Sequence, residues 1–183
     1  MTFTAIDFET AHACDPCQIG LTRVEKGQLV CTKSWLIKPA CFPYMNPYNE
    51  RVHGISSSDL QYAPTFERLW TELRPYLEDS ILVAHNAAFD MAVLKSALSY
   101  FDLAKPWIEY FCSLSLSRKI WKKLPNGYSL GAMCEYHGIQ FRHHDAGEDA
   151  AACAALTLKA FDTVSATDLE NGLNLSGICL KKL

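Results

Sequence analysis

The chain has 183 residues, of which 49% are hydrophobic and 20% are charged, and its formal net charge is −3. This length and composition predict one globular domain with a full hydrophobic core. The negative balance excludes a protein that holds long nucleic acid by charge alone, but it is compatible with one that meets phosphate through bound metal ions.

No apolar run reaches the roughly 20 residues that a membrane-spanning helix needs. The first residues, MTFTAIDFETA, lack the basic region followed by an apolar core that marks a secretory signal. We therefore expect no membrane contact, and a cytoplasmic location by default.

The chain contains eight cysteines, but only Cys14 and Cys17 are spaced as a C-x-x-C pair. His12 could add a third metal ligand, yet no second pair completes a four-ligand zinc site. We expect reduced, partly buried thiols rather than a zinc or redox centre.

The first predicted elements are a strand at Phe3–Glu9 and a hairpin of Gln18–Val24 and Leu29–Ile37 around a turn with glycine. After a Pro-rich loop, apolar residues recur at helical spacing or in one short buried run. These patterns predict a strand within 80–86 and helices at Thr65–Leu77, Phe89–Phe101, Ser113–Lys123, Ser129–His137 and Glu148–Phe161.

Strands that alternate with helices after a hairpin predict an α/β domain with a mixed central sheet of about five strands flanked by helices. We assign this domain to residues 1–164. From residue 165 the chain turns polar and loses its period, so we expect 165–183 to be a polar tail or linker, which could run toward a further domain.

Asp7 and Glu9 interrupt the apolar first strand, and side chains two positions apart in a strand point the same way. Two like charges beside a core are costly unless a cation neutralises them, and hard divalent ions suit carboxylate oxygens. The alternative is a solvated strand end with two surface acids. Taken alone, the pair fits both interpretations equally.

A third acid, Asp90, follows the predicted strand that stops at His85 and Asn86. We expect Asn86 to cap the next helix, which places Asp90 in its first turn, at the sheet edge where α/β proteins bind ligands. Asp90 could then face the pair on the first strand. Otherwise it is an acid favoured by the helix dipole.

A fourth acid lies in HHDAGEDAAACAAL, where Asp145 and Glu148 have the spacing of a capping box. In that register His144 and Asp149 occupy the two positions that meet across a helix start. His143 is the rival histidine but lies farther from Asp149. Capping alone explains Asp145 and Glu148.

Together Asp7, Glu9, Asp90 and Asp149 could hold two Mg²⁺ or Mn²⁺ ions roughly 3.5–4 Å apart, which clamp the attacking and leaving oxygens of a phosphodiester. His144 could take a proton from the attacking water. Zinc is disfavoured because it prefers nitrogen and sulfur ligands.

Three ordered motifs make residues 1–161 resemble the DEDDh exonucleases of the ribonuclease H-like fold, the group that includes the proofreading subunit of bacterial replicative DNA polymerase. D-x-E appears as Asp7-Phe8-Glu9, the second motif is HNAAFD ending in Asp90, and the third is H-x4-D at His144 and Asp149. Each motif is weak alone, whereas three in order are specific.

The resemblance implies a 3′→5′ exonuclease that releases nucleoside 5′-monophosphates from the 3′ end of nucleic acid, with DNA favoured and with two Mg²⁺ or Mn²⁺ ions. Asp7 would bridge both metals, Glu9 and Asp149 would complete one, and Asp90 would hold the other, with His144 as general base. A downstream domain or a polymerase is a candidate partner.

The resemblance also suggests contacts to the terminal nucleotide, although a loop-anchoring role is equally compatible with Ile55. The candidates are Phe8, Thr10, Ala11, His53, Ile55 and Asn86. Relatives often carry a bulky apolar wedge where this chain has Ala13. The open alternatives are an exoribonuclease of the same fold and a non-catalytic nucleic-acid-binding domain.

Basic residues surround Trp121 in SRKIWKK, namely Arg118, Lys119, Lys122 and Lys123. They could follow the backbone of an incoming strand. We favour the other interpretation, a solvated helix face anchored in the core by Trp121.

Overall fold

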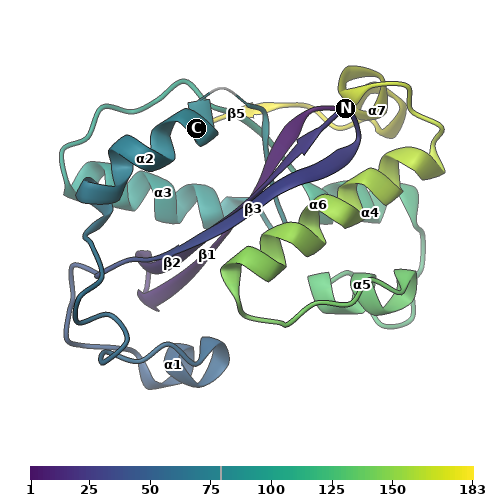
Figure 1. The fold of residues 1–183 in the computed structure, drawn as a ribbon. Coiled ribbons are helices and arrows are strands. Elements are labelled where there is room, and N and C mark those ends of the chain that lie inside the picture. Colours follow the sequence, from purple (N-terminus) through teal and green to yellow (C-terminus); the bar gives the residue numbers. More distant parts are fainter. Residues whose placement is uncertain (79) are drawn as a thin grey trace.

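A six-stranded mixed sheet forms the centre of the protein in the computed structural model, which describes residues 1–78 and 80–183 (Figure 1). Its order is β3-β2-β1-β4-β5-β6, with β1, β4 and β5 parallel and the other neighbours antiparallel. The strands are β1 Phe3–His12, β2 Asp15–Glu25, β3 Gln28–Leu36, β4 Leu82–Ala84, β5 Glu109–Cys112 and β6 Lys181–Lys182.

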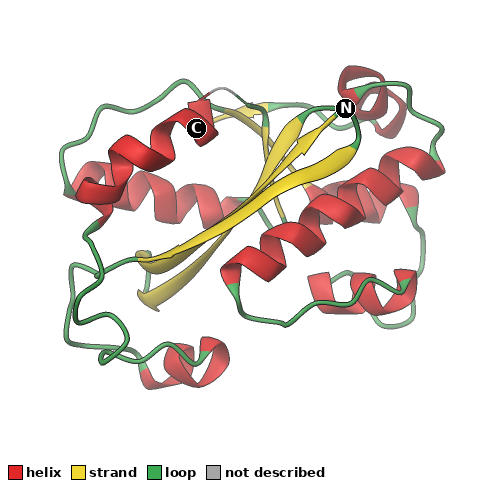
Figure 2. Ribbon diagram, in the orientation of Figure 1, coloured by secondary structure: helices red, strands yellow, loops and turns green. Residues whose placement is uncertain are grey.

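Helices cover both faces of this sheet (Figure 2), so the predicted α/β architecture is confirmed. Figure 1 shows α2 and α3 on one side and α4, α5 and α6 on the other. The helices are α1 Pro47–His53, α2 Phe66–Glu78, α3 Ala88–Tyr100, α4 Ser113–Ile120, α5 Leu130–His137, α6 Ala146–Thr163 and α7 Leu169–Ser176.

Alternation along β1 divides the core into two clusters. Ile6 and Phe8 pack in the cluster formed with α2 and α3, whereas Phe3 and Ala5 pack in the cluster formed with α4 and α6. Successive strand residues point to opposite faces, so Asp7 shares the α6 face with Phe3 and Ala5. The two predicted hairpin strands and the predicted helices form at nearly the expected positions.

A glycine brings β2 and α6 into close approach. Gly20 pairs with Asp7 in the sheet, and a Cβ added at Gly20 would overlap the backbone of Ala146 at the start of α6. Gln18, two residues earlier, accepts a hydrogen bond from the Ala146 N–H through its side-chain oxygen at 3.2 Å. Both contacts fix the start of α6 against the strand beside β1.

Within residues 1–164, two elements were not predicted, α1 and β5. The helix α1 lies inside the segment that we expected to be a Pro-rich loop, with Asn46 as N-cap, Pro47 in its first turn and Gly54 as a left-handed C-cap. These are ordinary helix start and stop signals, and the density of prolines obscured them. The strand β5 has four residues and depends on pairing with β4 and β6.

Residues 165–183 are not an irregular tail, so that expectation is wrong for their secondary structure. They form α7 and β6, and β6 joins the sheet beside β5. Leu173 packs with Phe161 in one core cluster, and Leu183 packs in the other. The periodicity was hard to recognise because α7 has eight residues and buries only Gly172 and Leu173.

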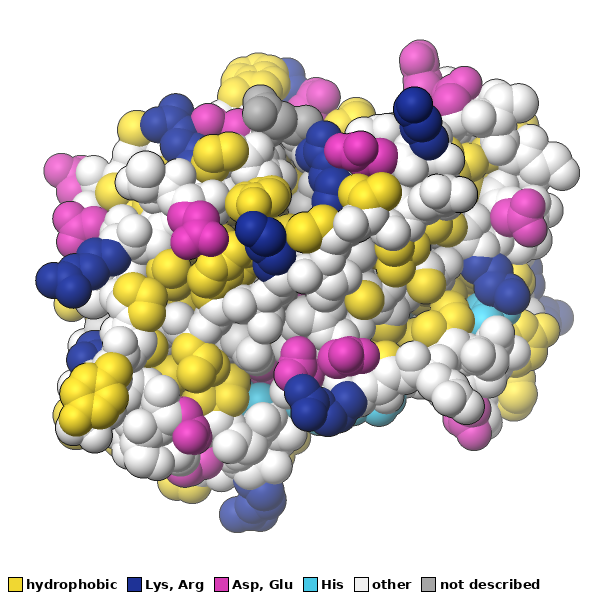
Figure 3. All heavy atoms as spheres, viewed as in Figure 1, with side chains coloured by type: hydrophobic (Ala, Val, Ile, Leu, Met, Phe, Trp, Pro, Cys, Tyr) yellow, Lys and Arg dark blue, Asp and Glu magenta, His cyan; other side chains and the backbone are white. Residues whose placement is uncertain are grey.

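Charges of both signs are intermixed over the face shown in Figure 3, in keeping with the small net charge. In the part of the chain that the structure describes, no helix has the length and apolar character needed to cross a membrane.

Candidate active site

The acids predicted from three separate motifs converge around the middle of β1, beyond the carboxyl end of β4. Asp7 and Glu9 come from β1, Asp90 from the first turn of α3 and Asp149 from the first turn of α6. Asp90 is almost completely buried, and its Oδ1 accepts a hydrogen bond from the backbone N–H of Phe8 at 3.2 Å. Because β1 is a central strand, carboxylates from elements on both faces of the sheet meet beside it.

Like charges and burial raise the pKa of each of these acids. Burial raises the pKa of Asp7 most, and the charges of Asp90, Asp149 and Glu9 raise it further. Burial and then the charges of Asp149 and Asp145 raise the pKa of Glu9 to about 7. Burial also raises the pKa of Asp90 and of Asp149. The folded chain thus holds four carboxyl groups together against their own repulsion.

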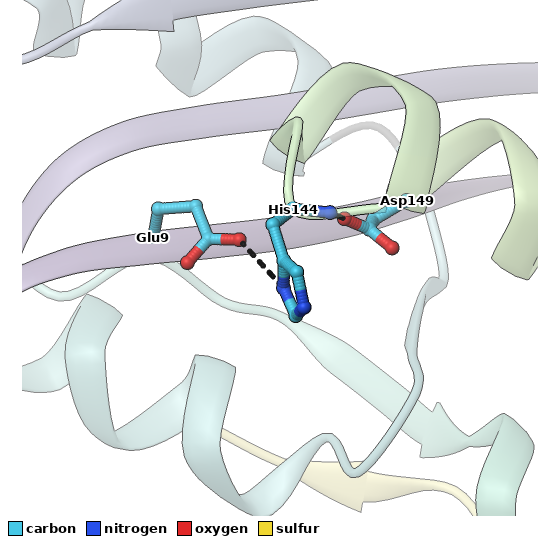
Figure 4. Close-up of side chains that lie close together, drawn as sticks. All are labelled: Glu9, His144 and Asp149. Atoms are coloured by element: carbon cyan, nitrogen blue, oxygen red, sulfur yellow. Dashed lines mark hydrogen bonds and ion pairs between the residues drawn. The ribbon is translucent and has the colours of Figure 1, made fainter. Parts of the chain in front are cut away.

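His144 lies between Glu9 from β1 and Asp149 from α6 (Figure 4). Its ring Nδ1 is 3.8 Å from Glu9 Oε1, and half of its side-chain surface is exposed. Its backbone N–H donates to Asp149 Oδ2 at 2.7 Å. The predicted meeting of His144 and Asp149 therefore occurs, but through the backbone of His144, which leaves the ring free on the Glu9 side.

The start of α6 has the predicted cap. The carboxylate of Asp145 accepts hydrogen bonds from the N–H groups of Gly147 and Glu148 at 3.1 and 3.3 Å, and it also pairs with Arg142. His144 precedes the cap with a left-handed backbone, φ 64°. The cap and this turn together direct the chain so that His144 and Asp149 face the same space.

Asn86 does not cap α3 with its side chain, contrary to the prediction. The N-cap is Ala87, which makes no side-chain cap bond, and Asn86 instead adopts φ 74° with its carbonyl accepting from the N–H of Phe89 at 2.9 Å. Asp90 nevertheless lies in the first turn, because the N-cap is only one residue later than expected, at Ala87 instead of Asn86.

The donor set fits a hard divalent cation. Glu9, His144 and Asp149 each offer one ligand atom, and these atoms lie within 4.8 Å of one another. Within residues 1–78 and 80–183, no Lys or Arg forms a salt bridge with the four acids. The acids are therefore left to be neutralised by protons or by a cation of another kind, and oxygen-rich sites favour Mg²⁺ or Mn²⁺.

Asp7, Glu9 and Asp149 line a cleft of about 1110 Å³, whereas Asp90 is buried and is not among its lining residues. Phe8, Asn86, Phe89, Arg118 and Tyr128 also line this cleft. A recess of about 380 Å³ adjoins the cleft at Glu9. A polynucleotide end could enter this cleft and place a phosphodiester beside the carboxylates.

The predicted substrate contacts fall into two groups. Phe8 and Asn86 line the cleft, and Thr10 and His53 line the adjoining recess, as does Ala13. By contrast, Ala11 and Ile55 are buried in a small cluster with Cys17, Met45 and Leu60.

His53 links the recess to that buried cluster. Its Nδ1 accepts from the N–H of Ile55 at 3.0 Å, so Nε2 carries the proton and donates to the carbonyl of Thr10 at 3.2 Å. These bonds favour the loop-anchoring interpretation for Ile55.

Several cleft residues were not selected from the sequence. His85 hydrogen-bonds Ser113 Oγ through Nδ1 at 2.9 Å and the carbonyl of Tyr128 through Nε2 at 2.8 Å. Phe89 is 41% exposed beside Asn86. The position of His85 at the end of a buried strand was the available signal, whereas nothing local marked Tyr128.

The residues around Trp121 do not all fit one of the two interpretations, contact with a nucleic-acid backbone or a solvated helix face. Lys119 Nζ donates to the carbonyl of Gly177 and Lys122 Nζ donates to the carbonyl of Arg118. Trp121 packs against the core cluster formed with α4 and α6, and its ring is tilted against that of His137, with the ring centroids 4.3 Å apart. Arg118 alone of this group lines the cleft.

The C-x-x-C pair does not belong to the acid cluster, although Cys17 is close enough for the charge of Glu9 to act on its thiol. Cys17 is buried, burial raises its thiol pKa, and its Sγ is 3.8 Å from His53 Nε2. Cys14 lines a separate pocket of about 320 Å³ with Cys41, and His12 packs against the ring of Tyr44. All eight cysteines are free thiols.

The sequence model of the RNase_T family, described as exonuclease, matches residues 4–157. Over 167 residues the chain is 33% identical to the PolC-type DNA polymerase III of Thermotoga maritima, covering 86% of this chain and 12% of that protein. Over 166 residues it is 30% identical to the 3′-5′ exonuclease DinG of Staphylococcus aureus, covering 88% and 18%. The chain thus spans less than a fifth of these relatives.

Solved structures share the fold at low sequence identity. Exonuclease X in complex with 5′ overhanging duplex DNA has a TM-score of 0.76 at 24% identity, covering 96% of this chain and 99% of that one. The nuclease domain of 3′hExo, a DEDDh family member bound to rAMP, has a TM-score of 0.74 at 15% identity, covering 88% and 92%. From its matched sequence, its ribonuclease H-like sheet and its three acidic motifs, this chain belongs to the RNase_T exonucleases of the DEDDh type.

Proposed function

We propose that this chain is a metal-dependent 3′→5′ exonuclease that releases nucleoside 5′-monophosphates from the 3′ end of nucleic acid. The observation that carries the proposal is the convergence of Asp7, Glu9, Asp90 and Asp149, with raised pKa values, in an open cleft. Within the described residues no Lys or Arg pairs with these four acids, so the fold stores repulsion that a divalent cation removes.

Asp7 is the residue we propose to face both of two Mg²⁺ or Mn²⁺ ions, because the charges of all three other acids act on it. Glu9 and Asp149 would hold one ion, and Asp90 would hold the other. When bound, such a pair supplies charge stabilisation for the attacking and leaving oxygens of a phosphodiester.

His144 is the proposed general base. Its backbone is anchored to Asp149, while its half-exposed ring lies next to Glu9 and open to water. A positioned imidazole that accepts the proton of an attacking water accelerates hydrolysis about 10²–10⁴-fold.

The terminal nucleotide would lie between the acids and the recess at Glu9. Phe8 and Asn86 on the cleft wall and Thr10 and His53 on the recess wall are the proposed direct contacts. Ala11 and Ile55 are buried, so we assign them an indirect role. Ala11 would hold the end of β1, and Ile55 would hold the loop, that carry these contacts.

DNA is the favoured substrate, since the relatives include a PolC-type DNA polymerase III and Exonuclease X has been solved with duplex DNA. The second candidate is an exoribonuclease, because 3′hExo was solved with rAMP and a related 3′-exonuclease recognises a histone mRNA stem-loop. The PolC match also makes a polymerase, or a further domain, a proposed partner.

A substrate panel tests this proposal. The wild-type chain and Asp7→Asn are incubated with 3′-labelled single strands, duplexes and short RNAs, with EDTA, Mg²⁺ or Mn²⁺. We expect labelled mononucleotides that require metal and disappear in Asp7→Asn. Persistent cleavage in that variant would refute the site, oligomeric products would indicate endonuclease action, and binding without cleavage would support the non-catalytic alternative.

A further inference from the structure

Arg118 presents a cation to the cleft that Asp7, Glu9 and Asp149 line. It lies in the last turn of α4, and among the residues lining the cleft it is the one Lys or Arg within the described parts of the chain. In those same parts its guanidinium forms no salt bridge. A guanidinium offers five donors in a planar fork that matches phosphate oxygens.

A network of hydrogen bonds fixes the ring beneath Arg118. The guanidinium carbon lies 5.9 Å from the centroid of Tyr128. The hydroxyl of Tyr128 donates to the carbonyl of Trp121 at 2.7 Å, and the Tyr128 carbonyl meets His85 Nε2 at 2.8 Å. Stacking on an immobilised ring keeps the cation at the cleft wall and reduces the entropy lost when it binds an anion.

Arg118 lies on the part of the cleft wall that α4, Tyr128 and His85 form, whereas the carboxylates come from β1, α3 and α6. Its charge is one of the causes that lower the pKa of His85, after burial. The charges that shift the pKa values of Glu9 and Asp149 belong instead to neighbouring acids and histidines. The phosphate being cleaved must lie at the carboxylates, so Arg118 is placed to meet a different phosphate of the same strand.

We infer that Arg118 is a positioning residue that binds a non-scissile backbone phosphate, on the α4 side of the acid cluster. The inference rests on the proposed function for the strand's orientation, with the cleaved bond at the acids. Lys119, the next residue, is a matched control because it has the same charge but its ammonium contacts Gly177 at the end of α7.

Binding is measured first, by fluorescence anisotropy of a labelled single-stranded oligonucleotide with Ca²⁺ in place of Mg²⁺ and over a range of salt. One lost phosphate contact lowers the slope of log affinity against log salt by about 0.7 for a single strand. We expect this decrease in Arg118→Gln, with affinity about tenfold weaker. Arg118→Lys should restore the slope, and Lys119→Gln should match wild type.

Hydrolysis then separates the two kinds of phosphate. The p-nitrophenyl ester of thymidine 5′-monophosphate has a single phosphodiester, whereas an oligonucleotide offers phosphates beyond the cleaved one. In Arg118→Gln we expect KM for the oligonucleotide to rise about tenfold, and KM for the ester to rise much less. Circular dichroism and the thermal midpoint check that the variants fold.

Arg118 has no such role if Arg118→Gln keeps the wild-type salt slope, or if it impairs both substrates equally. Failure of the proposed function looks different, since the wild-type chain would then cleave neither substrate with Mg²⁺ or Mn²⁺. In that case the salt slope of binding alone still decides whether Arg118 holds a phosphate.

Discussion

The carboxylate of Asp90 on α3 accepts a hydrogen bond from the backbone N–H of Phe8 on β1, 82 positions away in sequence, at 3.2 Å. This bond ties the first turn of a helix to the central strand, between Asp7 and Glu9. It stabilises the charged form of a side chain whose burial disfavours that form. Burial of the ionised Asp90 without a cation should therefore lower the free energy of unfolding.

Replacing Asp90 with Asn should separate activity from stability. The amide oxygen can still accept from Phe8, whereas the charge is lost. We expect activity to fall more than about 100-fold, beyond the usual 10–100-fold effect of groups that only support a metal ligand. The metal-free variant should melt higher than metal-free wild type at pH 8, where 1 kcal/mol corresponds to roughly 2–4 °C. A lower melting temperature with retained activity would contradict this account.

The stability of the metal-free protein should depend on pH. A glutamate in an unfolded chain titrates near ~4.3, whereas Glu9 titrates at about 7 in the folded chain. At this carboxyl the folded state therefore binds the proton more tightly, so the contribution of Glu9 to stability is greatest below the unfolded pKa and is lost as the pH rises through about 7. The raised pKa values of Asp7, Asp90 and Asp149 act in the same direction.

Thermal melts in EDTA between pH 4.5 and 8.5 measure this dependence, and repeats with Mn²⁺ measure how much of it the cation removes. We expect the melting temperature to fall with increasing pH in EDTA and to change much less with Mn²⁺, because the ion stabilises the ionised acids. A melting temperature in EDTA that is independent of pH would contradict the raised pKa values of the acids. A melting temperature at pH 8 that Mn²⁺ leaves unchanged would contradict binding of the ion.

His144→Gln should lower kcat by about 10²–10⁴-fold through loss of the general base. Because the hydrogen bond to Asp149 comes from the backbone, the substitution should leave the acids in place. A Mn²⁺-dependent thermal shift should thus persist. If the shift disappears with activity, His144 is a metal ligand rather than the base, an alternative that its distance to Glu9 and Asp149 permits.

His143→Gln provides the comparison between adjacent histidines. His143 packs on Phe141, with ring centroids 4.1 Å apart, and lies over Gly131 at the start of α5. We expect a smaller loss of kcat than in His144→Gln. A larger loss would reverse the assignment of the base.

Gly20→Ala should damage the site from the neighbouring strand, on the sheet face that α6 covers. The new Cβ would overlap the Ala146 backbone, so α6 must move away from β2 and carry Asp149 with it. Overpacking of this kind costs about 1–3 kcal/mol. We expect lower stability, and lower activity even when measured well below the melting temperature.

Gly172→Ala is the matched control, because its Cβ would meet the ring of Phe161 in the core, away from the cleft. It should lower stability comparably while the remaining folded protein keeps its activity per molecule. Equal activity losses in the two variants would show that the approach of α6 to β2 matters only for stability.

Local patterns in the sequence were sufficient to identify the parts of the site. The period of two in β1 fixed Asp7 and Glu9 on one face, and the cap at Asp145 fixed the start of α6, since both depend on neighbouring residues only. The helical and strand periods likewise predicted most of the sheet and the helices that cover it. The order of the three acidic motifs indicated the family without any structure.

Tertiary structure decided what those parts do together. Whether Asp90 and Asp149 reach β1, and how far burial raises their pKa values, depends on packing between segments far apart in the chain. The same packing turns Lys119 toward α7 and leaves Arg118 in the cleft, a distinction that their adjacent positions in one helix do not encode. Short elements such as β5 and β6 were also beyond local prediction, because pairing with a neighbouring strand stabilises them rather than their own periodicity.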